Sequence, residues 1–288
     1  MYPASFDYVA PTSLEEAISL LDAHGHDAKV IAGGQSLIPL MKFRFASPAV
    51  LVDINGIPGL DGIAEGDGGL RIGALVRHKD CERSPMLHGG RWGLLGATAR
   101  LVADPLVRNR GTVCGSLAHA DPQGDWASAM MAARGSVVAR GPGGSRTIPV
   151  GELVRGPFET QIEPNEIITE VVVPDPGPST GGTYLKLERK VGDYATAAAA
   201  VVLTMARGKV ATCAIGLTNL SETPLLAEDA AKAVIGTGLD DASVNKAATA
   251  AKAIMSPAAD GRGPVEYRKH VGGIMVMRAL QRAASRAG

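Results

Sequence analysis

The spacing of apolar and polar positions divides the chain into three stretches with different periodicities. In the first stretch, apolar residues recur at helical spacing and predict a helix that follows Ser13 and ends at Gly25. Ser13 is a suitable N-cap, and Glu16 three residues later completes a capping box. Short apolar runs at 28–32 and 49–54 predict two strands, so this stretch is expected to form a small α/β unit.

The second stretch mixes the two periodicities. Strand-like runs lie at 69–76, 136–140 and 166–173, and helical patterns lie at 92–103 and 127–133. Asp104-Pro105 is expected to break the first of these helices, because proline has no amide hydrogen to donate. The sequence Pro-Asp-Pro-Gly-Pro-Ser at 174–179 is the clearest boundary signal in the chain.

The third stretch reads as strands followed by helices. Apolar runs at 183–190, 195–205 and 210–217 predict strands, and Arg207-Gly208 predicts a hairpin between the last two. Helical patterns follow at 225–234, 242–255 and 264–287. An antiparallel sheet with helices on one face is expected. The whole pattern predicts an α+β protein with a two-part N-terminal α/β region, 1–57 and 58–177, and a C-terminal sheet with a helical bundle, 178–288.

Charge and cysteine content exclude several classes of protein. The net charge is zero and the pI is near 7.0, so the chain lacks the excess of positive charge that is typical of nucleic-acid-binding proteins. The three cysteines are scattered and no C-x-x-C occurs, so neither an iron–sulfur cluster nor a structural zinc is expected in this chain. Lone histidines such as His78 and His119 are more often satisfied structural residues than metal ligands.

The odd number and scattered positions of the cysteines indicate a protein of the reducing cytoplasm. The N-terminus lacks the basic and apolar regions of a signal peptide. The longest apolar run lies within 195–206, which is shorter than the roughly 20 residues that span a bilayer. No catalytic triad or carboxylate pair is evident, so no catalytic residue is assigned to this chain.

Two glycine-containing segments, about 80 positions apart, carry the candidate chemistry. Glycine permits positive φ and close approach to a ligand, and successive amides in such turns form concave anion sites. Together, two such segments are able to hold a diphosphate, with hydroxyls as further donors. Two ordinary tight turns are the alternative. Neither G-x-G-x-x-G after a strand nor G-x-x-x-x-G-K-[ST] occurs. The segments are Ala32-Gly33-Gly34-Gln35-Ser36 and Gly111-Thr112-Val113-Cys114-Gly115-Ser116.

In this order, the two segments resemble the FAD-binding medium subunit of the molybdenum hydroxylases. The second segment continues as G-T-[IV]-x-G-x-x-x-x-x-x-P-x-x-D, which ends at Asp125. The stretches 189–197 (RKVGDYATA) and 260–268 (DGRGPVEYR) are similar to the medium subunit of aerobic, molybdenum–copper carbon monoxide dehydrogenase. The resemblance covers essentially the whole chain.

The resemblance implies FAD as the cofactor and assigns residues to it. Residues 1–57 and 58–177 would be the two FAD-binding subdomains. Asp125 would hydrogen-bond the ribityl chain, with a helix N-cap as the alternative role, and Tyr194 would lie near the isoalloxazine ring, with a core position as the alternative. The two glycine segments would cradle the diphosphate, and the remaining expected contacts are Lys29 and Leu37.

Three positions depart from the pattern common in the family. Gln35 stands where histidine is frequent, Cys114 where glycine is frequent, and Ser116 where asparagine is frequent. Glutamine and serine still donate hydrogen bonds. If position 114 requires positive φ, the cysteine side chain costs about 1 kcal/mol or more.

The resemblance also implies a division of labour among subunits. A large molybdenum–copper subunit oxidises carbon monoxide, and a small subunit carries two iron–sulfur clusters. The medium subunit then passes electrons through FAD to an external acceptor, expected to be a quinone. A dimer of heterotrimers is expected, in the cytoplasm or at the inner face of the membrane. The alternatives are the FAD subunit of a purine, aldehyde or nicotinate hydroxylase, a free-standing flavin reductase, and a non-catalytic nucleotide-binding scaffold.

Overall fold

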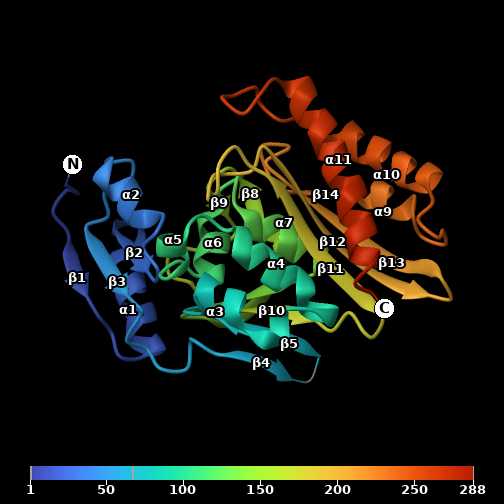
Figure 1. The fold of residues 1–288 in the computed structure, drawn as a ribbon. Helices are drawn as coiled ribbons and strands as arrows, with labels where there is room; N and C mark the ends of the chain where they lie inside the picture. The colour runs from blue at the N-terminus through green and yellow to red at the C-terminus, as the bar shows by residue number, and fades with distance from the viewer. Residues whose placement is uncertain (1, 67, 288) are drawn as a thin grey trace.

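The computed structural model describes residues 2–66 and 68–287, so the outer limits of the predicted division, Met1 and Gly288, lie outside the described residues. Figure 1 shows three units in a row. The N-terminal sheet lies at one end, the C-terminal helices lie at the other, and the second sheet with its helices lies between them. The α+β class predicted from the sequence is confirmed. The division at 57 and 177 stays a prediction.

The first unit is a small parallel sheet in the order β1-β3-β2. Its parallel strands require crossover connections, which the helix α1 and the segment around α2 supply. Residues of α1 pack into the same apolar core as β3 and the second sheet. The bounds are β1 Asp7–Val9, α1 Leu14–His24, the 3₁₀ turn η1 Gly25–Asp27, β2 Ala28–Ile31, α2 Leu37–Lys42 and β3 Val50–Asp53.

Helix α1 has the start, end and face that the sequence predicts. The Ser13 side chain accepts a hydrogen bond from the amide of Glu16, and Gly25 ends the helix at φ +53°. The Glu16 carboxylate accepts from the amide of Thr12 at 2.9 Å, one residue earlier than in a standard capping box. The buried face consists of the four apolar residues of the periodicity: Leu14, Ala17, Ile18 and Leu21.

The second unit is an antiparallel sheet in the order β4-β5-β10-β6-β7, with a small β8-β9 ribbon beside it. In Figure 1, helices α3 to α7 lie on one side of strands β4, β5 and β10. The strands are β4 Ile63–Gly66, β5 Gly69–Gly73, β6 Ser136–Gly141, β7 Gly144–Pro149, β8 Val154–Gly156, β9 Glu159–Thr160 and β10 Ile167–Pro174. The helices are α3 His78–Arg83, η2 Pro85–Leu87, η3 Gly90–Trp92, α4 Gly93–Leu101, α5 Pro105–Arg108, α6 Val113–His119, α7 Asp125–Ala132 and α8 Val150–Leu153.

The third unit is an antiparallel sheet in the order β11-β12-β13-β14, with the C-terminal helices on one face. Arg207 and Gly208 both have positive φ and close the predicted hairpin between β12 and β13. The bounds are β11 Thr180–Leu187, β12 Ala197–Ala206, β13 Lys209–Thr218, β14 Leu225–Leu226, α9 Glu228–Lys232, α10 Asp241–Ile254 and α11 Val265–Ala284.

Small residues hold the third sheet between two layers of helices. Along β12, Ala197 and Ala199 pack toward the C-terminal helices, whereas Ala198 and Ala200 pack toward α4 and α7. This alternation follows from the two-residue period of a strand whose faces are both covered. A Cβ placed on Gly216 would lie 2.1 Å from the carbonyl oxygen of Ser128 in α7. The third unit therefore sits directly on the helices of the second.

Among the differences between the observed and the predicted elements, three have a local cause. Residues 113–116, expected to belong to a glycine loop, lie in helix α6. Residues 225–234, expected to be one helix, begin as the short strand β14 and become helical only at Glu228. The helix predicted over 92–103 ends at Leu101, before Asp104-Pro105, and Asp104 instead starts the next helix, because it accepts the amide of Val107 as an N-cap.

Within residues 2–66 and 68–287, no helix is long and apolar enough to cross a membrane.

Candidate functional site

The fold brings the two glycine segments into direct contact. A Cβ placed on Gly33 would lie 2.3 Å from the carbonyl oxygen of Arg110 and 2.8 Å from Cα of Gly111. Real Cβ atoms do not come this close to backbone, so the contact requires glycine at position 33. The backbones of the first and second units therefore meet where the two segments touch.

The first segment leaves β2 and turns into α2. Gly34 adopts φ +71°, a conformation that favours glycine. The amides of residues 33–37 donate to no other atom of the described chain. Gln35 and Ser36 are exposed and Leu37 is half-buried, while Lys29 is exposed on β2. This segment presents a run of free donors at the start of a helix.

The second segment is the start of helix α6 rather than a glycine turn. The Thr112 hydroxyl caps the helix by accepting the amide of Gly115 at 3.0 Å. The amides of Thr112 and Cys114 donate to no other described atom. Ser116 is half-buried and Gly115 is exposed. Free amides and the partial positive charge at a helix start favour an anion.

Cys114 is not strained, contrary to the cost that the sequence analysis allowed for. It lies in the first turn of α6 and its φ is not positive. Its side chain points into the core, with Sγ 3.8 Å from the carbonyl oxygen of Ile72, and burial raises the pKa of the thiol. Val113 is also fully buried. Both residues offer a ligand their backbone rather than their side chains.

His78 supports the second segment from behind. Its amide donates to the carbonyl of Gly111 at 2.9 Å, and a Cβ on Gly111 would lie 2.8 Å from the imidazole ring. The ring stacks on Trp126, and its Nδ1 accepts the indole N–H at 3.1 Å. Burial, with help from Arg108 and Arg77, lowers the pKa of His78 to about 3. His78 is therefore a neutral structural residue, as lone histidines usually are.

Asp125 is the first residue of α7, and Gly124 holds the N-cap position. The carboxylate is buried and accepts from two side chains of β11, the Tyr184 hydroxyl at 2.7 Å and the Lys186 ammonium at 3.1 Å. Burial raises the pKa of Asp125, and the Lys186 charge opposes that rise. Sequence analysis missed Tyr184 and Lys186. Their signal was a pair of polar residues two apart in an apolar strand.

Tyr194 does not fill the core between sheet and helices. It is 46% exposed, and its hydroxyl donates to Asp121 in the connection between α6 and α7 at 2.8 Å. The Arg262 guanidinium lies 5.8 Å from the ring centroid. Partial burial and the Asp121 carboxylate raise the pKa of Tyr194, so the hydroxyl remains protonated. A loop of the third unit thus contacts the connection that follows helix α6.

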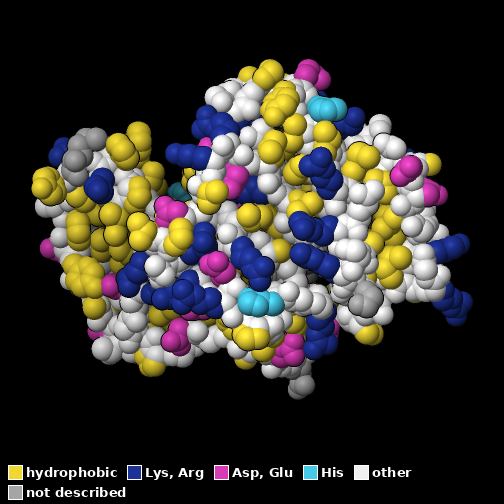
Figure 2. Space-filling model, in the orientation of Figure 1, with side chains coloured by type: hydrophobic (Ala, Val, Ile, Leu, Met, Phe, Trp, Pro, Cys, Tyr) yellow, Lys and Arg dark blue, Asp and Glu magenta, His cyan; other side chains and the backbone are white. Residues whose placement is uncertain are grey.

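The residues of this site suit the diphosphate of FAD. The free amides of residues 33–37, Thr112 and Cys114 provide donors from two segments that touch. Figure 2 shows the surface hollowed between the N-terminal lobe and the rest of the molecule. Buried or half-buried amides need a partner, and an anion supplies one. The glycine contact, the free donors and the helix starts together fit the cofactor.

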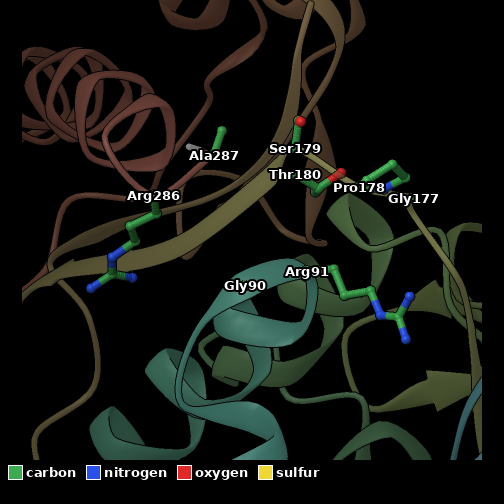
Figure 3. A pocket seen from close by; sticks show the side chains of 8 residues that line it. All are labelled: Gly90, Arg91, Gly177, Pro178, Ser179, Thr180, Arg286 and Ala287. Carbon is green, nitrogen blue, oxygen red and sulfur yellow. The ribbon is translucent and has the colours of Figure 1, made fainter.

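A separate open hollow of about 290 Å³ contains no residue of either glycine segment. It lies where η3 meets the C-terminal end of the chain, and Figure 3 shows its two arginine side chains pointing apart. Arg91 pairs with Glu65 and Asp175, and Arg286 donates to the carbonyl of Gly182. Because both guanidiniums already have partners, this hollow does not compete as a diphosphate site.

Comparisons with known proteins identify the family of the chain. The family described as "FAD binding domain in molybdopterin dehydrogenase" matches residues 4–176, and "CO dehydrogenase flavoprotein C-terminal domain" matches residues 182–283. The carbon monoxide dehydrogenase medium chain of Afipia carboxidovorans is 45% identical, over 100% of this chain and 99% of the relative. The 6-hydroxypseudooxynicotine dehydrogenase complex subunit alpha of Paenarthrobacter nicotinovorans is 38% identical, over 100% and 97%. A chain of reconstituted CO dehydrogenase from Oligotropha carboxidovorans superposes with a TM-score of 0.97 at 44% identity, over 99% and 100%.

Proposed function

Because the chain belongs to the family of FAD-binding domains of molybdopterin dehydrogenases, we propose that it is the medium, FAD-carrying subunit of a carbon monoxide dehydrogenase. The observation that carries the proposal is full-length identity of 45% with a carbon monoxide dehydrogenase medium chain. The match of residues 182–283 to the flavoprotein C-terminal domain of that enzyme supports it further. The chain is thus an oxidoreductase subunit with FAD as its cofactor.

In this proposal the protein binds and orients the cofactor, and bound flavin supplies the redox chemistry. The amides of residues 33–37, Thr112 and Cys114 hold the diphosphate, with the hydroxyls of Ser36 and Ser116 as further donors. Lys29 and Leu37 complete the contacts around the first segment. The backbone amides are fixed by the local structure of the two segments, so they are in place before the cofactor arrives.

Asp125 and Tyr194 orient the remainder of the cofactor. Each carboxylate oxygen of Asp125 has one intramolecular partner and keeps a second lone pair, which is able to accept from a ribityl hydroxyl. Tyr194 stands beside the isoalloxazine ring, where its phenol keeps its proton at physiological pH. One hydrogen bond to Asp121, and the Arg262 guanidinium 5.8 Å from the ring centroid, hold the phenol ring in one orientation.

The subunit acts within a larger complex. We assign it a large molybdenum–copper partner and a small iron–sulfur partner, arranged as a dimer of heterotrimers in the cytoplasm. Electrons pass from the iron–sulfur clusters to the flavin and then to an external quinone. The second candidate is the same role in another molybdenum hydroxylase, which the 38% full-length identity with the 6-hydroxypseudooxynicotine dehydrogenase subunit favours.

Co-expression of a tagged chain with its neighbouring genes tests the function. We expect two partner subunits to co-elute in fixed ratio, with one FAD per copy of this chain in the visible spectrum. Under anaerobic conditions, carbon monoxide should bleach the flavin absorption of the complex and leave that of the isolated chain unchanged.

Bleaching by a purine, an aldehyde or a nicotine derivative, but not by carbon monoxide, would support the second candidate instead. Flavin reduction by a reduced nicotinamide cofactor, NADH or NADPH, in the isolated chain would indicate a free-standing flavin reductase. A colourless preparation would contradict any flavoprotein role.

A further inference from the structure

One arginine side chain connects the two glycine segments. Nη1 of Arg77 donates to the carbonyl oxygen of Arg110 at 2.6 Å, directly before Gly111. Nη2 of the same guanidinium donates to Oδ1 of Asn55. Nδ2 of Asn55 then donates to the carbonyl oxygen of Ala32 at 2.8 Å, directly before Gly33. Three hydrogen bonds thus join Ala32, the first residue of the first segment, to Arg110, which precedes the second.

Asn55 is held in place by hydrogen bonds to neighbouring residues. The amide of Asn55 donates to the Asp53 carboxylate at 2.8 Å, and the Tyr8 hydroxyl donates to the same carboxylate. Burial opposes ionisation of Asp53, but these hydrogen bonds hold its pKa below the ordinary value. The Asn55 side chain therefore has one possible orientation, with its oxygen toward Arg77 and its nitrogen toward Ala32.

The backbone of Arg77 is anchored to the second segment as well. Residues 76–78 pair with residues 111–113 as a short antiparallel bridge, through the His78 amide to Gly111 and the Val113 amide to Val76. The Arg77 amide donates to Asp80 at 3.0 Å, which fixes the start of α3. Arg77 is thus part of the second unit, and only its side chain reaches the first.

We propose that Arg77 and Asn55 are positioning residues that set the spacing of the two glycine segments and thereby the affinity for FAD. This inference rests on the proposed function. A diphosphate that takes hydrogen bonds from both segments needs their amides at a fixed separation. Each segment is a short connection and does not by itself fix its distance from the other. The planar guanidinium with two fixed donor directions is suited to hold two carbonyl-bearing segments at once.

The test compares FAD binding by the assembled complex with and without the bridge. The complex is purified with its partners, stripped of flavin and titrated with FAD, and the dissociation constant is read from flavin fluorescence. Loss of charge-assisted hydrogen bonds in Arg77→Ala should raise the dissociation constant about 10- to 100-fold. Arg77→Lys, which keeps the charge but reaches one acceptor only, should be intermediate.

Asn55→Ala provides the second arm. Because the bridge is a series of bonds, the double variant Arg77→Ala/Asn55→Ala should bind FAD no more weakly than the weaker single variant. The matched control is Arg140→Ala. Arg140 also joins the first and second units, by donating to Glu15 of α1 at 2.7 Å, but it does not contact either glycine segment. The control should bind FAD within about twofold of the wild type, because an exposed ion pair contributes little.

The thermal midpoint of the flavin-free complex separates positioning from general stability. We expect Arg77→Ala to lower that midpoint more than Arg140→Ala, because it loses two charge-assisted hydrogen bonds, but to leave the complex folded at the titration temperature, where its FAD affinity is lower. Unchanged affinity in both Arg77 variants would overturn the inference, and so would an equal loss in Arg140→Ala. A wild-type complex that binds no FAD at all would instead overturn the proposed function itself.

Discussion

At the scale of the residue, Gly33 shows that a glycine in a cofactor segment has a structural reason of its own. The sequence suggested that glycine is needed where the backbone approaches a phosphate. The structure gives a more immediate reason, because a Cβ there would lie 2.3 Å from the Arg110 carbonyl oxygen. That carbonyl is also the acceptor of Arg77. A side chain at position 33 therefore pushes the two segments apart.

We expect Gly33→Ala to weaken FAD binding by about tenfold or more, because overpacking costs about 1–3 kcal/mol. Gly62→Ala is the matched control, since a Cβ there meets no atom within 4 Å. Flavin content per chain after gel filtration of the complex checks both variants. Full FAD occupancy in Gly33→Ala would show that the contact between the segments is not needed for the cofactor.

At the scale of the element, His78 of α3 and Trp126 of α7 form the support behind the second segment. In the folded chain the pKa of His78 is about 3, whereas an exposed histidine has 6.5. Below pH 6.5 the imidazole of His78 therefore binds a proton in the unfolded chain but not in the folded chain. The contribution of the neutral His78 to the free energy of unfolding is fully present above pH 6.5. It is lost as the pH falls toward 3, by up to about 1.4 kcal/mol per pH unit.

His78→Gln should remove this part of the acid sensitivity, since a glutamine oxygen is able to accept the Trp126 N–H but does not titrate. The free energy of unfolding of both chains, measured by denaturant between pH 7.5 and 4.5, checks the prediction. The wild-type and variant curves should converge as the pH falls. Curves that stay parallel would mean that His78 is not held neutral by the fold.

Elements set by local signals were predictable from the sequence, and those set by tertiary contacts were not. Helix α1 and the Arg207-Gly208 hairpin have local caps, periodicity and turn residues, and both are confirmed. Helix α6 was missed because Gly115 argues against a helix, whereas the Thr112 cap and the bridge to residues 76–78 stabilise one. The start of 225–234 is a strand because β13 offers it an edge to pair with.

The site followed the same rule. The two segments and their meeting were within reach of motif reasoning, and the assigned roles of Asp125 and Tyr194 stay predictions. The Asn55–Arg77 bridge was out of reach, because 22 positions separate its members and nothing in their spacing marks them as partners. Tyr184 and Lys186 likewise become visible only when β11 is placed against α7.

At the scale of the whole molecule, the three units converge on one region. The first and second units supply the glycine segments, and the third brings Tyr194 to the connection after α6 and Lys186 to Asp125. Close backbone contact at Gly216 seats the third unit on α7. Binding of a cofactor at the two segments therefore depends on the relative positions of all three units.

Amide hydrogen exchange of the purified complex, with and without FAD, tests most directly that the cofactor lies between the two glycine segments. The account predicts that FAD slows amide exchange at residues 33–37, Thr112 and Cys114 together, since these free amides gain a partner. The amides of the residues that line the hollow between Arg91 and Arg286 should exchange at the same rate with and without FAD. Protection confined to that hollow, or to one segment alone, would contradict the account.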